Sequence, residues 1–327
     1  MLSHEVRMVK VKLGRVRGSI NVQPGHLVIL GRSGSGKSNT ARVIVKQIAR
    51  KGVPTLIIDW SGEHAGIEGF KVLRPGIDFR VKIFEGKDEA ERIDLLVDLF
   101  DAVFRLSAPQ LYMLRIAVKR AYAARATGLQ DLVKAIDRVP VRSYYDHETK
   151  MALIRRLSPL TEGVVGKALS GKGEAVDFTD RNMVVDLSVL KSIYAKRLFA
   201  LMLLKLIYDA ALGRGFRDEL AHATLVEEAW NIIPYRRPDS PPSVGERLFA
   251  ELRKYGECLI AIGQNPSGLA WSIINNAEIV IVHSLLPREA EILGLRELRL
   301  VIARLKRGEA LLISRGLVRK VKVRRER

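Results

Sequence analysis

The segment from Gly31 to Ser38 carries residue types that are suited to holding phosphate groups. It reads Gly-Arg-Ser-Gly-Ser-Gly-Lys-Ser and fits the pattern G-x-x-x-x-G-K-[ST] in full. Glycines let the backbone wrap closely, so that successive N–H groups point at phosphate oxygens. Lys37 would place a positive charge on the transferred phosphate, and Ser38 would offer its hydroxyl to Mg²⁺. The segment predicts binding of ATP and Mg²⁺ through Gly31, Ser33, Gly34, Ser35, Gly36, Lys37, Ser38 and Asn39.

Two adjacent glutamates, Glu227 and Glu228, follow the apolar run 222–226. We expect Glu227 to orient the magnesium ion and its waters, and Glu228 to polarise the attacking water as a general base. Neighbouring strand residues point to opposite faces, but at the end of a strand both can turn toward one site. The alternative is the start of a helix, where paired glutamates are also favoured. Their position directly after an apolar run favours the catalytic interpretation.

A further polar residue, Gln264, follows the apolar run 258–263. Its amide could donate to a phosphate oxygen or position the attacking water. The long interval between Lys37 and Glu228 leaves room for several strands. The same layout occurs in ATPases that have an added strand between the phosphate-binding segment (Walker A) and the acidic strand end (Walker B). We therefore expect Lys37, Glu228 and Gln264 to act together in hydrolysis.

Apolar runs and helical spacing indicate the elements that position these residues. Residues 26–30 are an apolar run that meets the glycine-rich segment directly, residues 38–51 have helical spacing, and residues 54–59 are a second apolar run. This succession is one βαβ unit. The fold class is therefore α/β, with a mainly parallel sheet flanked by helices. Further strands are expected at 183–187, 222–226, 258–263, 279–282 and 310–313, with two short ones in 71–84 and one or two among the first 25 residues.

The whole chain, 1–327, is expected to form a single ATPase domain with two additions. Residues 88–170 have a helical pattern and are interpreted as a helical insertion with a scaffolding role. Within it, a helix is expected from 110 toward 127, with Gly128 as its C-terminal cap. Residues 315–327 carry seven Lys and Arg residues against one Glu. We interpret them as a basic C-terminal tail that binds DNA or is disordered.

Composition limits the partners and the setting of the protein. The net charge is +19, from 55 Lys and Arg residues against 36 Asp and Glu residues, and such a charge attracts nucleic acid. The alternative is the charge-rich surface of a thermophile, but such surfaces are usually balanced in sign. The single cysteine, Cys258, allows no internal disulfide. Without a signal-type segment or a run of about 20 apolar residues, we expect a cytoplasmic protein without a membrane span.

Four segments together resemble the HerA/FtsK superfamily of hexameric DNA-translocating ATPases, and HerA most closely. The similarity covers about 26–313, with 88–170 matching only in position. It implies a RecA-like P-loop fold, DNA-stimulated ATP hydrolysis, and a homo-oligomeric, hexameric ring around double-stranded DNA. The four segments are Gly31–Thr40, Asp59–His64, Leu225–Asn231 and Leu252–Gly256 with its continuation to Pro266.

The resemblance also assigns residues that the pattern alone would not. It implies that Arg253 is an arginine finger that reaches the neighbouring subunit's site, with Lys254 as the second candidate. Without the resemblance, residues 246–254 would be interpreted as a solvated amphipathic helix. The turn Asp59–Glu63 is expected to sense the nucleotide or couple it to DNA, or else to be an ordinary cap and turn.

Three features depart from the pattern of the family. Trp60 and Ser61 stand where HerA usually has Pro-His, and Trp230 stands where it usually has His. We expect these changes to lie outside the core chemistry. The resemblance further implies a nuclease or other DNA-processing partner. However, the 25 residues before the first apolar run are too few for the β-barrel to which the nuclease docks in HerA.

For contact with DNA, a ring motor uses basic or polar loops that grip phosphates rather than base edges. Arg236 and Arg237 lie in a proline-rich loop after the paired glutamates, and Lys167 and Lys172 lie in a glycine-rich stretch. We interpret these four as candidate DNA contacts, and ordinary exposed loops as the alternative.

Together these observations predict an ATP-driven ring motor that translocates double-stranded DNA. A conjugation, secretion or viral-packaging motor would carry the same motifs. From another class, a regulatory P-loop switch would bind ATP and a partner but translocate nothing. A small-molecule kinase is disfavoured, because Arg253, Gln264 and the positive charge would then have no role.

Overall fold

The structure is a computed structural model in which residues 8–14, 19–84, 89–172, 176–237, 239 and 241–326 are described, without the side chains of Glu89 and Glu91. Residue 88, the first of the expected insertion, and residue 327, the last of the expected tail, lie outside the described residues. The chain divides into two compact units. The first comprises 1–72, 178–184 and 204–327, and the second comprises 73–177 and 185–203.

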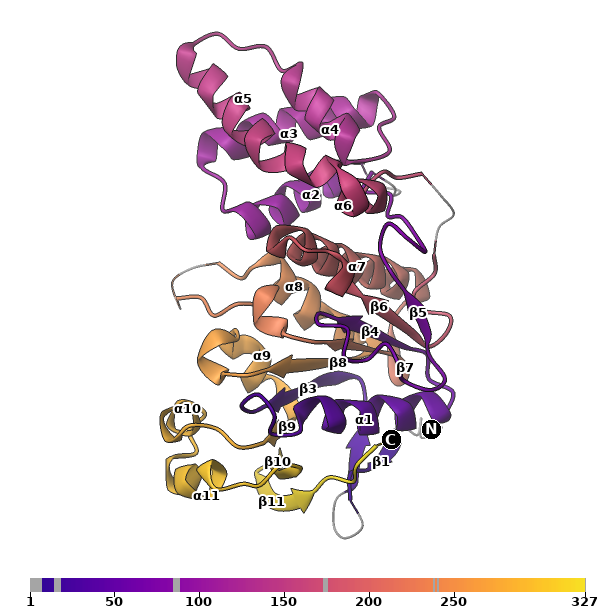
Figure 1. Cartoon of the computed structure of the whole chain (residues 1–327), viewed down its shortest axis with the longest axis vertical. Coiled ribbons are helices and arrows are strands. Elements are labelled where there is room, and N and C mark those ends of the chain that lie inside the picture. Colours follow the sequence, from indigo (N-terminus) through magenta and orange to yellow (C-terminus); the bar gives the residue numbers. More distant parts are fainter. Residues whose placement is uncertain are drawn as a thin grey trace, which may run out of the picture. The chain divides into compact units, whose positions relative to one another are not determined.

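A nine-stranded sheet, in the order β11-β10-β9-β3-β8-β7-β4-β6-β5, is the framework of the first unit (Figure 1). Strand β3 pairs in parallel with β8 and β9, and β7 pairs in parallel with β4 and β8, whereas β10 and β11 are antiparallel additions at one edge. The strands are β3 (Gly25–Leu30), β4 (Thr55–Asp59), β5 (Lys71–Leu73), β6 (Met183–Asp186), β7 (Arg217–Val226), β8 (Tyr255–Gly263), β9 (Ala277–Val282), β10 (Glu309–Ser314) and β11 (Leu317–Lys322).

The parallel strands are buried on both faces, which explains their continuous apolar sequences. Every residue of β3 and β4 is buried. A separate antiparallel pair, β1 (Val9–Lys12) and β2 (Ser19–Val22), contributes Val11 and Val22 to the core that also holds Ile44 and Ile260. The predicted mainly parallel α/β fold is therefore confirmed.

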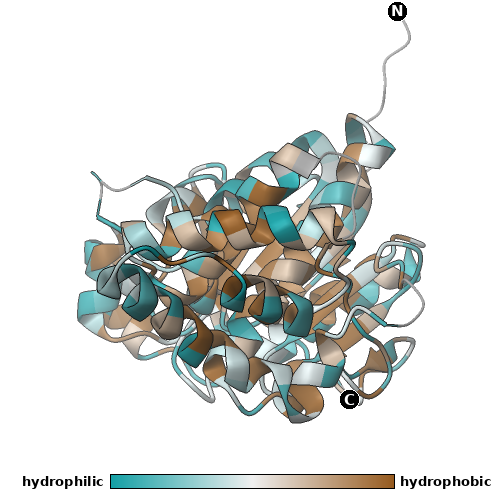
Figure 2. Cartoon of the chain, turned by 90° about the horizontal axis from the view of Figure 1, so that it is seen from above, coloured by the Kyte–Doolittle hydropathy of each residue, from teal (hydrophilic) through white to brown (hydrophobic). Residues whose placement is uncertain are grey.

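Helix α1 (Lys37–Arg50) follows β3 after the glycine-rich loop and buries Val43, Ile44 and Ile48 against the sheet core. Figure 2 shows the segregation that stabilises such packing, with brown hydrophobic strands inside and teal residues on outward helix faces. The other helices that lie wholly in the first unit are α8 (Val244–Glu251), α9 (Trp271–Asn275), α10 (Pro287–Ile292) and α11 (Arg299–Ala303).

The second unit is helical (Figure 1). Helix α7 (Ile193–Arg214) begins in the second unit and ends in the first. None of the helices in the described part of the chain combines the length and hydrophobicity that a membrane span requires. The remaining helices are α2 (Glu89–Phe104), α3 (Ala108–Ala123), α4 (Leu129–Asp137), α5 (Tyr144–Leu157) and α6 (Gly163–Ala168).

Three local predictions differ from the structure. Gly128 is not the C-terminal cap of a helix: α3 ends at Ala123, and Gly128 precedes α4, where its N–H and that of Thr127 donate to the carboxylate of Asp131. Residues 71–84 contain one strand, β5, rather than two.

The third difference concerns the expected basic tail, because residues 317–322 form strand β11 rather than a disordered or free segment. They pair with β10 along its whole length, from Glu309 opposite Lys322 to Ser314 opposite Leu317. Val321 and Val323 are buried in the sheet core, so alternate apolar residues keep this basic segment on the protein.

Candidate nucleotide site

The predicted phosphate-binding segment is a loop that joins the carboxyl end of β3 to the N-terminus of α1. Its three glycines have backbone conformations that other residues rarely adopt, with φ of 155° at Gly31, 75° at Gly34 and 113° at Gly36. A Cβ atom at Gly31 would lie 2.6 Å from the Cβ of His283. Only glycine therefore allows the loop to lie this close to the end of β9.

The loop presents polar groups that have no hydrogen-bond partner in the part of the chain that the structure describes. Among the described residues, no acceptor binds the N–H groups of Ser33, Gly34 and Gly36, and the N–H groups at the start of a helix lack helical partners. The hydroxyl of Ser35 is buried and also lacks a hydrogen-bond partner. Lys37 is 8% exposed, and its Nζ donates to the carbonyl oxygen of Arg32 at 3.0 Å. This set of donors fits phosphate oxygens.

Lys37 also lies within the electrostatic influence of the two glutamates that were predicted to act with it. Burial lowers the pKa of Lys37, while the charges of Glu228, Glu63 and Glu227 oppose that shift. Lys37 therefore lies close enough to Glu228 to interact with its charge, and the joint action of the two residues stays a prediction.

Asn39 was predicted to contact the nucleotide, but its side chain is bound to the C-terminal segment. Its Nδ2 donates to the carbonyl oxygen of Arg324 at 2.9 Å, and its Oδ1 accepts from the N–H of Glu326 at 2.9 Å. The carboxylate of Glu326 also lies 2.9 Å from Nζ of Lys46, which is 5% exposed on α1. Residues 324–326 thus hold the helix that begins at the phosphate-binding loop. Ser38 is half-buried.

The candidate site residues meet because the parallel strands end at one edge of the sheet. Leu30 is opposite Gly263 of β8 and Val282 of β9, so Gly31 and Gln264 follow neighbouring strand ends. In the same way, Val226 at the end of β7 is opposite Ala261 of β8 and Ile58 of β4. The next residues in each chain segment therefore gather at the carboxyl edge, where α/β proteins place ligands.

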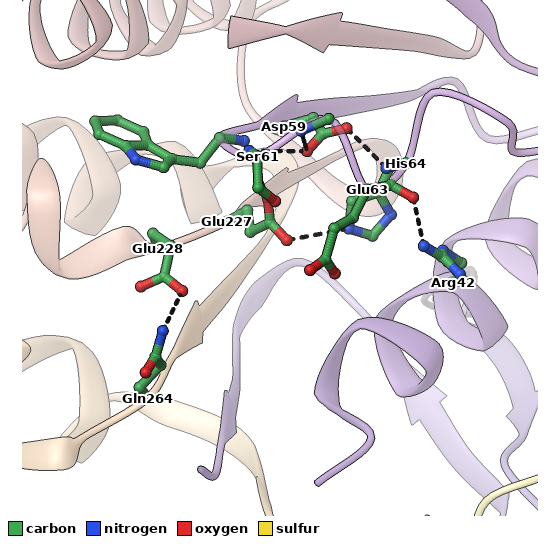
Figure 3. A network of polar contacts seen from close by, with 10 residues as sticks. Arg42, Asp59, Ser61, Glu63, His64, Glu227, Glu228 and Gln264 are labelled. Carbon is green, nitrogen blue, oxygen red and sulfur yellow. Dashed lines mark hydrogen bonds and ion pairs between the residues drawn. The ribbon is translucent and has the colours of Figure 1, made fainter. Parts of the chain in front are cut away.

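Glu227 is buried and is held by the turn that follows β4 (Figure 3). Its Oε2 accepts from the N–H groups of Trp60 at 3.0 Å and Ser61 at 3.2 Å, and from the Ser61 hydroxyl at 2.8 Å. Its Oε1 lies 3.6 Å from Nε2 of His64, a distance for charge attraction rather than a hydrogen bond. Burial alone would raise the pKa of Glu227, but His64 and Ser61 lower it to about 2. Only Oε1 remains for an ion or its waters.

The same turn is built on Asp59, the last residue of β4. Its carboxylate accepts from the N–H groups of Ser61, Gly62 and His64, which closes the turn (Figure 3). Burial and the neighbouring Glu227 raise the pKa of Asp59 to about 6. This turn therefore supports Glu227. Among the described residues, no group of three Asp, Glu, His or Cys side chains could hold a metal ion without further ligands.

Glu228 points away from Glu227 because the chain turns between them. Glu228 has a left-handed backbone, with φ of 49°, which is uncommon for a residue other than glycine. Its Oε1 accepts from Nε2 of Gln264 at 2.8 Å (Figure 3), and its Oε2 accepts from Nε1 of Trp230 at 2.6 Å. The two adjacent glutamates thus face different partners, and both oxygens of Glu228 are held.

Two departures from the family pattern, which were expected to lie outside the core chemistry, are in direct contact with the two glutamates. Trp230 donates to Glu228, and Ser61 donates to Glu227. Sequence reasoning also missed His283, whose Nδ1 donates to the carbonyl oxygen of Glu309 at 2.9 Å. Its Nε2 can then accept from the hydroxyl of Thr40 at 2.8 Å on α1. The only signal was its position directly after an apolar strand.

Arg253 lies at the opposite ends of the parallel strands from these residues, just before the start of β8. It is in a short turn before β8, is 59% exposed, and lies 3.3 Å from Oε1 of Glu278. Strand β8 runs from Tyr255 to Gly263 before it reaches Gln264. At a rise of about 3.3 Å per residue, the strand separates Arg253 from the carboxyl edge by roughly 26 Å. Arg253 and Lys254 are therefore not brought to the nucleotide site of their own chain.

The four candidate DNA contacts differ in their surroundings. Nε of Arg236 donates to Glu246 at 2.9 Å, in an ion pair with a carboxylate that is nearly buried. Arg237 is exposed. Lys167 and Lys172 are exposed in the second unit and line the same hollow.

The comparisons with known proteins agree with the family resemblance found in the sequence. Residues 19–207 match the family described as "Helicase HerA, central domain". The curated DNA double-strand break repair helicase HerA of Sulfolobus acidocaldarius is 21% identical over 292 residues, which cover 81% of this chain. The chain spans 57% of the length of that relative. The resemblance to the HerA/FtsK superfamily is thus confirmed.

Solved structures share the fold. VirB4 of Thermoanaerobacter pseudethanolicus has a TM-score of 0.70 at 18% identity, over 100% of this chain and 98% of that one. The bacterial conjugative coupling protein TrwB has a TM-score of 0.74 at 13% identity, over 99% of this chain and 90% of that one. TrwB has also been solved with ADP and Mg²⁺.

Proposed function

Because the chain belongs to the family of the HerA helicase central domain, we propose that it is an ATP-hydrolysing motor that forms a hexameric ring and moves double-stranded DNA through its centre. The observation that supports the proposal best is the position of Glu228. Its carboxylate is fixed between Gln264 and Trp230 at the sheet edge where the phosphate-binding loop begins. A protein that only binds a nucleotide does not need a carboxylate held in this way.

In the proposed site, the unpartnered donors of the loop and Nζ of Lys37 hold the phosphates of ATP. Ser38 would hold Mg²⁺ together with phosphate oxygens, and Glu227 would act on a water of that ion through Oε1, the oxygen that accepts no hydrogen bond from the turn after β4. The ion supplies charge neutralisation at the phosphates. Asn39 has a structural role instead, since both polar atoms of its side chain bind residues 324–326.

Glu228 would accept a proton from the attacking water as general base. Gln264 is hydrogen-bonded to it and stands at the neighbouring strand end, so the amide can turn from Glu228 to a phosphate oxygen or to the water. The left-handed backbone at Glu228 directs its carboxylate away from the Glu227 turn. Base and ion-orienting acid are thereby kept apart, although they are adjacent in sequence.

The position of Arg253 supports a shared site. An arginine that lies about 26 Å of strand away cannot stabilise charge at its own nucleotide, but it can reach a site on a neighbouring chain. Head-to-tail contacts of this kind close into rings. We therefore propose that the carboxyl edge of one subunit receives Arg253 of the next, within a single ATPase domain whose residues 88–170 are an insertion.

DNA-dependent hydrolysis tests the motor proposal. ATP turnover is measured with and without duplex DNA for the wild type, Glu228→Gln, and Glu297→Gln, an exposed acid outside the site. We expect DNA to raise the wild-type and Glu297→Gln rates, and Glu228→Gln to lower kcat about 10²–10⁴-fold. Turnover that ignores DNA in the wild type would contradict the motor and favour a regulatory ATP-binding switch.

A conjugation or secretion motor is a second candidate, supported by the fold shared with TrwB and VirB4. Such a motor would use the same site residues, so the same variants test its chemistry. The two differ in the partner protein, which we propose to be a nuclease or another DNA-processing protein in the first case. Co-purification with a DNA-processing protein supports that reading, and co-purification with a membrane secretion assembly supports the second.

A further inference from the structure

The second unit contains a hollow of about 590 Å³ whose lining includes Arg80, Lys167 and Lys172. Its volume is within the range of about 300–1,000 Å³ that is usual for ligand sites. At about 30 Å³ per water molecule, there is space for roughly 20 waters. A phosphate group with part of its hydration shell therefore fits.

Among the described residues that line the hollow, the charged side chains are all positive. Arg80, Lys167 and Lys172 are exposed, and within the described ranges none of them forms an ion pair with a carboxylate. The other lining residues are glycines, serine and threonine. Of the described acids close to them in the chain, Asp78 accepts from the N–H of Arg74, and Glu162 is exposed. Three exposed cations around one hollow attract an anion.

The backbone around the hollow is packed in a way that keeps it open. A Cβ atom at Gly166 would lie 2.0 Å from the carbonyl oxygen of Thr161, and one at Gly76 would lie 2.2 Å from that of Val164. At Gly163, by contrast, a Cβ atom would meet nothing within 4 Å. The backbone is thus closely packed at Gly166 and Gly76, whereas Gly163 leaves space for a ligand to approach.

We propose that Arg80, Lys167 and Lys172 bind phosphates of the DNA backbone in this hollow, so that the helical unit grips DNA without reading its sequence. The inference rests on the proposed DNA motor and goes beyond it by naming the place of contact and adding Arg80 to the two lysines. Phosphate contacts of this kind fix position and orientation but carry no sequence information. Arg236 is a poorer candidate, because Glu246 already neutralises it.

Salt-dependent binding of a fluorescent duplex, measured by anisotropy without ATP, tests this inference. The variant is Arg80→Gln/Lys167→Gln/Lys172→Gln. The matched control is Lys119→Gln/Arg125→Gln/Arg138→Gln, which removes the same charge from exposed cations of the same unit outside the hollow. Each duplex phosphate contact contributes about 0.9 to the slope of log K against log salt. We expect the hollow variant, which lacks three such contacts, to lose about 2–3 of that slope and at least about tenfold in affinity, and the control to lose much less.

Three results would overturn the inference, and they are distinguishable. Equal losses in both variants would mean that only net charge matters, while DNA binding by the motor would stand. A wild type that does not bind duplex DNA would remove both this inference and the proposed function. In a third experiment, the binding of inorganic phosphate is measured by calorimetry. If the binding of phosphate depends on the three cations but the binding of DNA does not, the hollow is a free-phosphate site. Thermal melting and binding of a fluorescent ATP analogue confirm that each variant is folded.

Discussion

Replacing Trp230 by phenylalanine should slow ATP hydrolysis without weakening ATP binding. The change removes the indole N–H that donates to Oε2 of Glu228 at 2.6 Å and keeps an aromatic ring. The left-handed backbone of Glu228 costs about 1 kcal/mol or more, so the carboxylate depends on its partners for its position. Gln264 would then be its only side-chain donor among the described residues.

The size of the effect follows from the strength of the lost hydrogen bond. A hydrogen bond to a charged group contributes about 1.5–3 kcal/mol, and the 38% exposure of Trp230 places this one at the lower end. Since about 1.4 kcal/mol corresponds to a factor of ten in rate, we expect kcat to fall about tenfold. The KM for ATP should stay within about twofold, because the phosphate-binding loop is unchanged.

Steady-state ATPase measurements at saturating duplex DNA separate kcat from KM. Trp271→Phe, at the start of α9, is the matched control, since no contact among the described residues links it to the glutamates and its change of residue type is the same. A Trp230→Phe enzyme with the kcat of this control would refute the reasoning. A raised KM at unchanged kcat would also do so, because it would place Trp230 in nucleotide binding.

Two further predictions concern stability. Glu326→Ala should lower the free energy of unfolding in urea by about 2–3 kcal/mol, because the buried Lys46 would then keep only its longer contact with the exposed Glu68. Glu68→Ala removes a partner that is 83% exposed, so it should change the free energy of unfolding by less than about 1 kcal/mol. Equal effects would contradict the proposed role of 324–326. Burial, aided by Arg253, lowers the pKa of His26 to about 4, so neutral His26 stabilises the fold fully above about pH 6.5 and that contribution is lost as the pH falls toward 4. His26→Phe should therefore reduce the loss of unfolding free energy between pH 7 and pH 5 by about 2 kcal/mol, and an unchanged pH dependence in urea titrations would contradict this.

The part of the site that could be predicted from the sequence depends on strand ends. Gly31, Glu228 and Gln264 each follow an apolar run, and parallel pairing brings such ends to one edge, so their gathering needed no knowledge of side-chain contacts. The tail 315–327 was expected to bind DNA or to be disordered, and its charge hid the alternate apolar residues Val321 and Val323, which are buried in the sheet core.

Other contacts could not be predicted because they join residues that are distant in the chain. The bonds from Asn39 to residues 324–326 span about the whole sequence, and no local pattern indicates them. The role of Trp230 depends on the left-handed turn at Glu228, a backbone state that glutamate rarely adopts. A family pattern with another residue at that position therefore gave no indication of this contact.

Mixing two inactive variants tests the shared site most directly. Glu228→Gln lacks the general base, and Arg253→Ala lacks the finger at the opposite edge of the sheet. If one subunit supplies Glu228 and its neighbour supplies Arg253, random 1:1 rings contain complete sites at about one quarter of their interfaces. We predict that the mixture, assembled with DNA, recovers about that fraction of the wild-type ATPase rate. A mixture as inactive as its components, in rings that demonstrably contain both, would contradict a site completed by the neighbouring chain.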